Sequence, residues 1–482
     1  MSKPIRVLLA SSEVSPLAST GGLAEVAGSL PQALTEVGLP TMVVMPAYPE
    51  ALAKAKISGP KLLLAVSMGV ELVEFEVLIG QLTSEVPVYL IRCDKFFDRP
   101  GLYGEGRTGY LDNPERFTFF SRAVIELLEH LPQKPQVILA NDWQTGLIMP
   151  YLLEAGPQAP KGIFIIHNQG YLGLAPPSLV SEIGLPDRYY GVEGLEYYGQ
   201  LSFLKAGIVF SQAVVTVSPS YAKEIQTPEG GNGLDGVLRL YAGKLHGIVN
   251  GVDYVQWNPM TDPYIAANYS ADDLAGKKIC KLALRRELNL SGPDRPLFGM
   301  VSRLTAQKGL TLVVESASEL FKLGLDLVIL GSGEPWFEEK LTAMAEDYPD
   351  NMRLVLGYNS QMSHRIIAGS DFVLVPSLYE PCGLIQLYGL RYGTIPVVRA
   401  IGGLNDTVRD YAGQNPAGLW DNGFKFSQFQ PGALVRAVRR ACELYAAPGE
   451  WAKMSNMNLK EDFSWTASAQ SYAKLIQKVA SA

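Results

Sequence analysis

The chain has 482 residues, of which 47% are hydrophobic and 18% are charged, and its formal net charge is −7. This length and composition fit a globular protein of two or three domains, and the negative balance argues against a broad nucleic-acid-binding surface. The four cysteines show no Cys-x-x-Cys spacing, so neither a zinc site nor a disulfide framework is indicated. No apolar run approaches the roughly 18 residues of a membrane helix, and the N-terminal run is too short for a signal sequence. We therefore expect a cytoplasmic protein without membrane or nucleic-acid partners.

Short apolar segments rich in β-branched residues alternate with helical patterns along the chain. The helical patterns are clearest at 115–130 and 310–323. The predicted strands are 6–10, 41–45, 86–91, 136–140, 162–166 and 213–217 in the first half, and 297–301, 325–330, 353–356, 371–375 and 395–398 in the second. Strands that are apolar on both faces and separated by helices predict parallel sheets covered on both sides. The predicted fold class is therefore α/β with doubly wound sheets.

This alternation breaks between about 250 and 296. The stretch begins with NGVDYVQWNPMTDPYIAANYS, which is rich in Asn, Asp, Pro and Tyr and shows no period. The rhythm of strands and helices resumes at Pro296. We therefore predict two Rossmann-like domains, joined near 250–258, with a ligand cleft between them.

A glycine pair follows the first predicted strand, in the segment LASTGGLAEVAG (17–28). Gly21 and Gly22 allow the backbone to approach a ligand closely, and the start of the following helix offers free N–H groups to an anion. A phosphate site of this kind usually has a cation beside it, but Ser19 and Thr20 provide only neutral hydroxyl donors. The loop is therefore a candidate phosphate site without a charge of its own.

The segment GGLNDTV (402–408) resembles GGLAEV (21–26) in the first loop. Both place an acidic residue, Asp406 or Glu25, in a predicted first helical turn, where a carboxylate interacts favourably with the helix dipole. Two interpretations stay open: helix capping with a tight turn, or two helix N-termini that face one cleft.

Two basic residues lie in the segment VSRLTAQKG (301–309), which leaves a predicted strand and enters a helix. In open α/β sheets this connection is at the ligand-binding edge. Arg303 can grip oxygens in a fork and Lys308 can act as a point charge, which together suit a diphosphate. The alternative is that both are solvated surface residues.

Three further candidates follow predicted strands. Glu380 lies before a Pro-Cys-Gly turn and is either a functional carboxylate or an ordinary surface residue. His167 ends a strand and is either a ligand contact or a structural histidine. Asp142 either contacts a sugar hydroxyl or caps the next helix.

The sequence contains no Asp-x-Asp and no cluster of His, Cys and Asp with metal-ligand spacing. Bound phosphates would therefore be neutralised by protein cations and helix ends, and we expect no metal and no other cofactor. The residues by themselves predict a metal-independent transferase with two Rossmann-like domains that uses a nucleotide-activated group.

The ordered motifs resemble those of glycosyltransferase family 5, the bacterial glycogen synthases and plant starch synthases, which have the GT-B fold. The matching segments run in family order along nearly the whole chain and include TGGLAEVAGSLP, DNPERFTFFSRA, NDWQT, IHNQGY, SRLTAQKG, YEPCGLIQLYGLRYG, GGLNDTV and DFSW. The resemblance implies an acceptor-side domain at 1–250, a nucleotide-sugar domain at 251–459, and a C-terminal helix at 460–482 that crosses back to the first domain. It also implies retaining transfer of glucose from ADP-glucose, or less often UDP-glucose, to the non-reducing 4-OH of an α-1,4-glucan.

The resemblance further implies roles for single residues. Arg303 and Lys308 would hold the diphosphate, and Glu380 would lie by the donor glucose. His167 would contact the sugar at C6, and Asp142 would help to arrange donor and acceptor. The remaining donor-binding residues would be Ser19, Gly21, Gly22, Tyr358, Gly383, Leu384 and Thr407, with Tyr358 near the nucleotide base.

The chain departs from the family pattern at Ser19, where the family has a lysine that approaches the donor phosphates. A hydrogen bond to a charged group contributes about 1.5–3 kcal/mol, and a neutral one about 0.5–1.5 kcal/mol, so the change predicts a loss of about 10- to 100-fold in transition-state stabilisation. Three interpretations stay open: an active glycogen synthase with an altered phosphate contact, a catalytically weak glucan-binding paralogue, and a synthase with another donor or acceptor.

Overall fold

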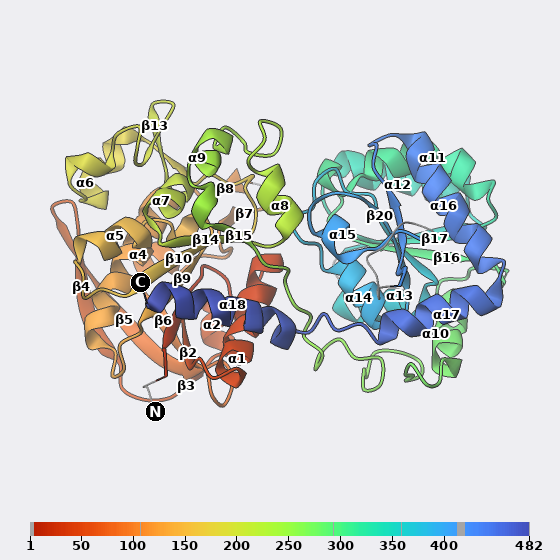
Figure 1. Cartoon of the computed structure of the whole chain (residues 1–482), viewed down its shortest axis with the longest axis horizontal. Helices are drawn as coiled ribbons and strands as arrows, with labels where there is room; N and C mark the ends of the chain where they lie inside the picture. The colour runs from red at the N-terminus through yellow and green to blue at the C-terminus, as the bar shows by residue number, and fades with distance from the viewer. Residues whose placement is uncertain (1–3, 107, 293, 358, 412–419, 482) are drawn as a thin grey trace. The chain divides into compact units, whose positions relative to one another are not determined.

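The computed structural model describes residues 4–481 apart from 107, 293, 358 and 412–419. The chain forms two compact units, one of Met1–Gly251 with Trp465–Ala482 and one of Val252–Ser464 (Figure 1). Each unit has a main sheet with helices on both faces (Figure 1). The predicted α/β class is therefore confirmed.

The main sheet of the first unit contains all six strands that the sequence predicts for the first half. Its strand order is β15 (Leu245–Gly247), β14 (Ala213–Thr216), β10 (Lys161–Ile166), β9 (Val137–Asn141), β1 (Val7–Ala10), β2 (Thr41–Pro46), β6 (Pro87–Arg92), β5 (Glu71–Gln81) and β3 (Lys56–Ile57), with β4 (Leu62–Met68) paired to β5. The part from β15 to β6 is parallel, as the apolar runs predict.

The antiparallel end of this sheet is a difference from the prediction of parallel sheets. Strand β5 pairs antiparallel with β3, β4 and β6. Its residues alternate between exposed and buried positions, for example Glu74 exposed and Phe75 buried. A strand with one solvated face has no continuous apolar run, which is the signal that identifies the buried parallel strands.

The remaining elements of the first unit are short strands and the helices that cover the sheet. The short strands are β7 (Gly104–Glu105), β8 (Thr108–Gly109), β11 (Leu174–Ala175), β12 (Glu196–Tyr197) and β13 (Gln200–Ser202). The α-helices are α1 (Gly22–Glu36), α2 (Pro49–Lys54), α3 (Asp94–Phe97), α4 (Asn113–His130), α5 (Ile148–Glu154), α6 (Val180–Ile183), α7 (Phe203–Phe210), α8 (Pro219–Glu224), α9 (Asp235–Leu240) and α18 (Trp465–Ala480), and the 3₁₀ helices are η1 (Trp143–Thr145), η2 (Pro177–Leu179), η3 (Asp187–Tyr189) and η4 (Ala242–Lys244). The C-terminal helix α18 packs against α1, which buries residues spaced three or four apart.

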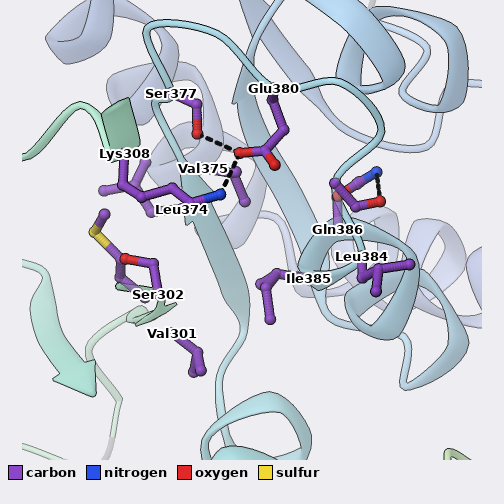
Figure 2. Close-up of a pocket in the computed structure, with 12 residues that line it drawn as sticks. Val301, Ser302, Lys308, Leu374, Val375, Ser377, Glu380, Leu384, Ile385 and Gln386 are labelled. Carbon is purple, nitrogen blue, oxygen red and sulfur yellow. Dashed lines mark hydrogen bonds and ion pairs between the residues drawn. The ribbon is translucent and has the colours of Figure 1, made fainter. Parts of the chain in front are cut away.

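The sheet of the second unit is parallel throughout. Its order is β18 (Met352–Leu356), β17 (Asp326–Gly331), β16 (Leu297–Val301), β19 (Phe372–Val375), β20 (Ile395–Arg399) and β21 (Phe424–Phe426). Its helices are α10 (Ala275–Glu287), η5 (Ala306–Lys308), α11 (Leu310–Phe321), α12 (Pro335–Asp347), α13 (Ser360–Gly369), α14 (Ile385–Arg391), α15 (Gly402–Thr407), α16 (Pro431–Tyr445) and α17 (Pro448–Leu459). Along β19, Phe372 and Leu374 pack into one hydrophobic cluster while Val373 and Val375 pack into another, so both faces are covered. The segments that follow β16 and β19 line one cavity (Figure 2).

Helix α10 lies inside the stretch where the sequence predicts a break in the alternation of strands and helices. That prediction is wrong for this helix, because its buried face carries charges. Lys277, Lys281 and Arg285 follow one another at intervals of four residues and are all buried. Each has a polar partner, which is the condition under which buried charges are tolerated. Apolar periodicity could not reveal a helix of this kind.

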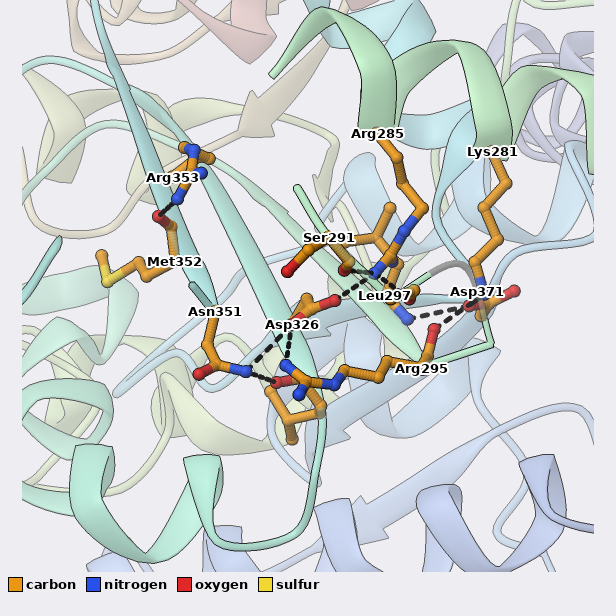
Figure 3. Close-up of polar contacts among 12 residues, drawn as sticks. Lys281, Arg285, Ser291, Arg295, Leu297, Asp326, Asn351, Met352, Arg353 and Asp371 are labelled. Atoms are coloured by element: carbon orange, nitrogen blue, oxygen red, sulfur yellow. Dashed lines mark hydrogen bonds and ion pairs between the residues drawn. The ribbon is translucent and has the colours of Figure 1, made fainter. Parts of the chain in front are cut away.

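The Lys281 ammonium connects α10 to the sheet (Figure 3). Its Nζ donates to Asp371 Oδ2 at 2.6 Å, to the Arg295 carbonyl at 2.8 Å and to the Tyr445 hydroxyl at 2.6 Å. The Asp371 carboxylate also accepts from the Leu297 N–H at 2.8 Å, and the Asp371 N–H donates to the Leu297 carbonyl at 2.9 Å. Asp371 therefore joins the N-terminal ends of β16 and β19 and fixes their register.

Replacing Asp371 by alanine should destabilise the second unit strongly. The change leaves the buried Lys281 ammonium without its carboxylate, and breaking a buried pair on one side costs about 3–5 kcal/mol. Urea unfolding of the whole protein should show a transition that moves to lower denaturant by that free energy. A double variant, Lys281→Met with Asp371→Leu, is the control and should recover most of the loss. A single variant within about 1 kcal/mol of the wild type would contradict the assignment.

Candidate active site

The predicted site residues lie on segments that follow parallel strands. This edge of an α/β sheet is where ligands bind. Tyr358 lies outside the described residues. In the first unit the glycine pair follows β1, Asp142 follows β9 and His167 follows β10; in the second unit Arg303 and Lys308 follow β16, Glu380, Gly383 and Leu384 follow β19, and Thr407 ends α15.

The glycine loop of the first unit is open to solvent. Ser19, Thr20, Gly21 and Gly22 are all exposed, and α1 begins at Gly22 without a side-chain cap. A Cβ at either glycine would meet nothing within 4 Å, so the space beside the loop is free for a ligand. The first turn of α1 can therefore offer its N–H groups to an anion, as the sequence predicts.

A buried carboxylate that the sequence analysis missed holds this loop. Glu13 Oε2 accepts from the Thr20 N–H at 2.5 Å, and Glu13 Oε1 accepts from the Thr20 hydroxyl at 2.8 Å and from the Tyr103 hydroxyl at 2.6 Å. Both donors of Thr20 are therefore used inside the protein, and the expectation that its hydroxyl serves a ligand is wrong. Ser19, the residue before Thr20, is exposed to solvent. The signal for Glu13 was a carboxylate three residues after the end of a buried strand.

Asp142 and His167 lie together at the ends of β9 and β10. Asp142 Oδ1 accepts from the His167 N–H at 2.7 Å and from the Asn168 N–H at 3.4 Å. Asp142 makes no side-chain cap to η1, so the interpretation as a helix cap is wrong. Its φ of 55° lies in the left-handed region, which is uncommon for a residue other than glycine and concentrates at functional sites.

Burial sets the protonation of this pair. Burial raises the pKa of Asp142 to about 7, although the N–H groups of His167 and Asn168 oppose the change. Burial lowers the pKa of His167 to about 3, so the imidazole is neutral at neutral pH. Asn141 Nδ2 donates to the Ala10 carbonyl at 2.9 Å, and this fixes Asn141 Oδ1 as the acceptor for His167 Nε2 at 2.8 Å. His167 Nδ1 therefore carries the lone pair.

In the second unit, Lys308 and Glu380 form an ion pair (Figure 2). Lys308 Nζ lies 2.7 Å from Glu380 Oε2, which also accepts from the Ser377 hydroxyl at 2.8 Å. The approach depends on Gly309, whose φ is +73° and where a Cβ would lie 2.0 Å from the Pro376 carbonyl. The glycine lets the segment after β16 lie against the segment after β19.

The ion pair borders a cavity of about 40 Å³ (Figure 2). The Ser302 hydroxyl and Gln386 Oε1 are buried beside it and have no hydrogen-bond partner among the described residues. Unpaired buried polar atoms are rare in native proteins and call for a water or a ligand. The cavity therefore suits a polar ligand group, and neither Ser302 nor Gln386 was predicted as a site residue.

Arg303 is exposed on the same loop as Lys308. Its Nη2 donates to Gln307 Oε1 at 3.3 Å, and Gln307 Nε2 donates to the Tyr379 carbonyl at 3.3 Å. Gln307 thus links the loop of the predicted cations to the loop of Glu380, while the guanidinium stays accessible to a ligand.

Gly383 and Leu384 line the same cavity as Lys308 and Glu380. Gly383 has a φ of +74°, and a Cβ there would lie 2.4 Å from Gln386 Oε1. Thr407 is buried, and its hydroxyl accepts from Gln386 Nε2 at 3.3 Å. Gln386 therefore connects Thr407 to the Gly383 turn.

The similarity between the two glycine-pair segments is only partly reproduced. Glu25 lies in the first turn of α1, as predicted. Helix α15 has only six residues, and Asp406 is its fifth, outside the first turn. The prediction for Asp406 is therefore wrong, because α15 begins at the first glycine of its pair whereas α1 begins at the second.

Among the described residues, no group of three or more His, Cys, Asp and Glu side chains is arranged to hold a metal ion. None of the helices within the described ranges is long and apolar enough to cross a membrane.

Comparisons with known proteins agree over the whole chain. The family model for the starch synthase catalytic domain matches residues 6–240, and that for glycosyl transferases group 1 matches residues 284–456. The chain is 44% identical to the glycogen synthase of Syntrophotalea carbinolica, over 98% of this chain and 99% of that protein. It is also 44% identical to the glycogen synthase of Anaeromyxobacter sp. strain Fw109-5, over 99% of this chain and 100% of that protein.

Solved structures also match the fold. The catalytic domain of starch synthase IV from Arabidopsis thaliana, bound to ADP and acarbose, matches with a TM-score of 0.92 and 34% identity over 100% of both chains. Sucrose-phosphate synthase from Thermosynechococcus elongatus matches with a TM-score of 0.60 over 98% of this chain and 99% of that one; at 16% identity this likeness shows the fold alone.

The fold and the family models define a glycosyltransferase of the GT-B class. Within that class, the chain belongs to the family of bacterial glycogen synthases and plant starch synthases. The predicted fold class, enzyme class and glycogen synthase function are therefore confirmed.

The raised pKa of Asp142 predicts a pH-dependent stability. Below its usual value of 3.8 the carboxyl is protonated in both folded and unfolded chains, so it contributes no penalty; above about 7 it is a buried charge, and the penalty is complete. The free energy of unfolding contributed by this group thus falls as the pH rises from about 4 to 7. Asp142→Asn keeps an acceptor oxygen and removes the charge, so it should stabilise the protein by about 1–3 kcal/mol at pH 8 and little at pH 4.5.

Urea unfolding of wild type and variant at the two pH values measures this difference. Asn141→Asp, which changes a neighbouring side chain to a carboxylate, serves as the opposite control and should destabilise more at pH 8. An Asp142→Asn effect that is equal at both pH values would contradict the burial argument.

Proposed function

We propose that the enzyme transfers glucose from ADP-glucose to the 4-OH at the non-reducing end of an α-1,4-glucan, with retention at the anomeric carbon. The observation that carries this proposal is the Lys308–Glu380 ion pair, which lines a cavity at the carboxyl edge of a parallel sheet, with Arg303 exposed on the same loop as Lys308. The similarity to a starch synthase that binds ADP and acarbose supports a nucleotide donor and a glucan acceptor.

The reaction breaks the bond from C1 of glucose to the diphosphate and forms a bond from C1 to O4 of the acceptor. The acceptor hydroxyl gives its proton to the departing diphosphate, so the products are ADP and a glucan longer by one glucose. Negative charge grows on the diphosphate oxygens in the transition state. Arg303 and Lys308 would meet that charge with donors already in place, which lowers the barrier more than it strengthens substrate binding.

The ion pair with Glu380 gives Lys308 a fixed position before substrate binds. Glu380 holds the ammonium at 2.7 Å and is itself held by Ser377 at 2.8 Å, so neither group must be reoriented during the reaction. We propose that Glu380 also lies by the donor glucose. The unpaired Ser302 hydroxyl and Gln386 amide oxygen can take hydrogen bonds from the donor.

The first unit would supply contacts to sugar hydroxyls. His167 is neutral and keeps a lone pair on Nδ1, so Nδ1 can accept a hydrogen bond from a sugar hydroxyl. Asp142 would help to arrange donor and acceptor, and the N–H groups of the first turn of α1 beyond Gly21 would reach the phosphates.

The phosphate charge would be balanced by protein cations, without a metal or another cofactor. The support for this is that Arg303 and Lys308 lie on one loop. Lys308 lines the cavity, and Arg303 is exposed.

A donor panel tests the proposal. The purified protein should incorporate glucose from ADP-glucose into glycogen and into short maltodextrins, with a lower rate from UDP-glucose, and EDTA should leave the rate unchanged. Lys308→Met should lower kcat by about 100-fold or more. Because it also leaves the buried Glu380 carboxylate without its cation, its activity is compared with that of the wild type below the melting temperature of the variant. Binding of glycogen without transfer from any donor would instead favour a glucan-binding paralogue, and a preference for another nucleotide would correct the donor.

Restoring a cation to the first loop should improve donor use. Ser19 is exposed next to Thr20, which Glu13 holds, so a lysine at this position can extend from an anchored backbone. Ser19→Lys should raise kcat/KM for ADP-glucose by about 10- to 100-fold, because a charged contact to phosphate replaces a neutral one. Ser19→Met matches the length without the charge and should give no gain. Equal kinetics of Ser19→Lys and wild type would show that this position does not limit the enzyme.

A further inference from the structure

The hairpin of β12 and β13 presents an aromatic side chain to solvent in an unfavourable backbone conformation. Glu196 pairs with Leu201 and Tyr197 pairs with Gln200, so the turn consists of Tyr198 and Gly199 alone. Both have positive φ, 46° at Tyr198 and 79° at Gly199. The Tyr198 side chain is 82% exposed.

The two-residue turn requires this conformation, but the fold does not explain why a tyrosine adopts it. A two-residue turn with two positive φ angles favours Asn-Gly or Asp-Gly, and a bulky aromatic residue in its first position is an outlier. A buried ring could compensate for the strain by packing, but the exposed ring of Tyr198 gains little from the rest of the protein. A strained residue that the fold does not require points to a function.

The hairpin is held firmly from three sides. The buried Lys205 ammonium donates to the carbonyls of Val192 and Glu196, both at 2.6 Å. The Ser202 hydroxyl donates to the Leu172 carbonyl at 2.8 Å, and the Tyr197 hydroxyl donates to the Asn232 carbonyl at 2.9 Å. The ring of Tyr198, which lies against Tyr197 at 4.9 Å between centroids, is therefore displayed by a rigid support. A preorganised ring binds with a small loss of entropy.

The same loops connect the hairpin to the predicted sugar site. Gln169, two residues after His167, donates from Nε2 to the Gly231 carbonyl at 3.2 Å. The neighbouring carbonyl, that of Asn232, accepts from Tyr197. Between His167 and the hairpin, Tyr171 is 55% exposed. Leu172 follows Tyr171, and its carbonyl accepts from Ser202 of β13, so the segment that carries Tyr171 contacts the hairpin that displays Tyr198.

We propose that Tyr198, with Tyr171, forms an outer binding surface for the α-1,4-glucan acceptor, remote from the glucose unit that reacts. This inference rests on the proposed function, because it assigns the acceptor to the first unit. Each glucose ring has faces made of C–H groups and edges made of hydroxyls, and such a ring packs on an aromatic face while its hydroxyls stay in water. A long glucan reaches the hairpin from the His167 loop, whereas a short acceptor fills only the positions next to the reacting end.

The test replaces the ring by the residue that the turn prefers. Tyr198→Asn removes the aromatic face and relieves the strain, so its melting temperature should equal or exceed that of the wild type. Its dissociation constant for glycogen, measured by affinity electrophoresis, should rise about threefold to tenfold. Its KM for glycogen should rise similarly, while kcat and KM with maltotriose and the KM for ADP-glucose should stay unchanged.

Two controls separate the ring from other effects. Tyr198→Phe keeps the aromatic face and should retain wild-type affinity. Trp336→Ala removes another exposed aromatic side chain, on α12 of the other unit, and should leave glycogen affinity unchanged.

Equal affinities of Tyr198→Asn and wild type for glycogen would overturn the inference, as would an equal loss with maltotriose. Electrophoresis needs no catalysis, so a wild-type protein that binds glycogen through Tyr198 but transfers no glucose would refute the proposed function and leave the inference standing.

Discussion

The hydrogen bonds of Asp371 are the interaction on which the second unit depends. One carboxylate oxygen accepts both the Lys281 ammonium of α10 and the Leu297 N–H at the start of β16. The start of β19 is thereby fixed against the start of β16, and parallel pairing carries this register to the other ends of the two strands. The segments that leave those ends bring Lys308 within 2.7 Å of Glu380. The Lys281–Asp371 pair at one end of these strands and the Lys308–Glu380 pair beyond the other end are thus connected by a single strand register.

In the first unit, buried carboxylates hold single loops. Glu13 and Asp142 are buried carboxylates, and each accepts N–H groups from a loop at the carboxyl edge of the sheet. Hydrogen bonds to a buried side chain restrict the backbone of these loops. The burial that makes these anchors rigid also raises the pKa of Asp142 and keeps His167 neutral. Stability and the chemistry of the site are therefore set by the same desolvation.

The sequence predicted the buried parallel strands and failed where a local rule was reversed. Every strand predicted from an apolar run lies in one of the two main sheets, because burial on both faces demands such a run, but β4 also has the apolar run LLLAV and was missed. Strand β5 has one solvated face, and α10 turns Lys277, Lys281 and Arg285 inward, so neither shows the expected apolar pattern. The loop residues that bear charge could be listed from their positions after strands. Their partners could not, since nothing in the local sequence shows that Ser377 and Gln386 lie beside the cavity, and Glu13 was overlooked although it closely follows a buried strand.

The amino-acid sequence by itself determined the α/β class, the family and the set of charged residues at the strand ends, because strand periodicity and ordered motifs are local properties of the chain. It also determined that Ser19 stands where the family has a cation. Only the tertiary structure decided which of these groups meet: Lys308 with Glu380, and Asp142 with the backbone of the His167 loop. The physical reason is that pairing, burial and the resulting pKa changes depend on which distant segments are neighbours in space, and that is fixed by strand order and by buried charges rather than by local pattern.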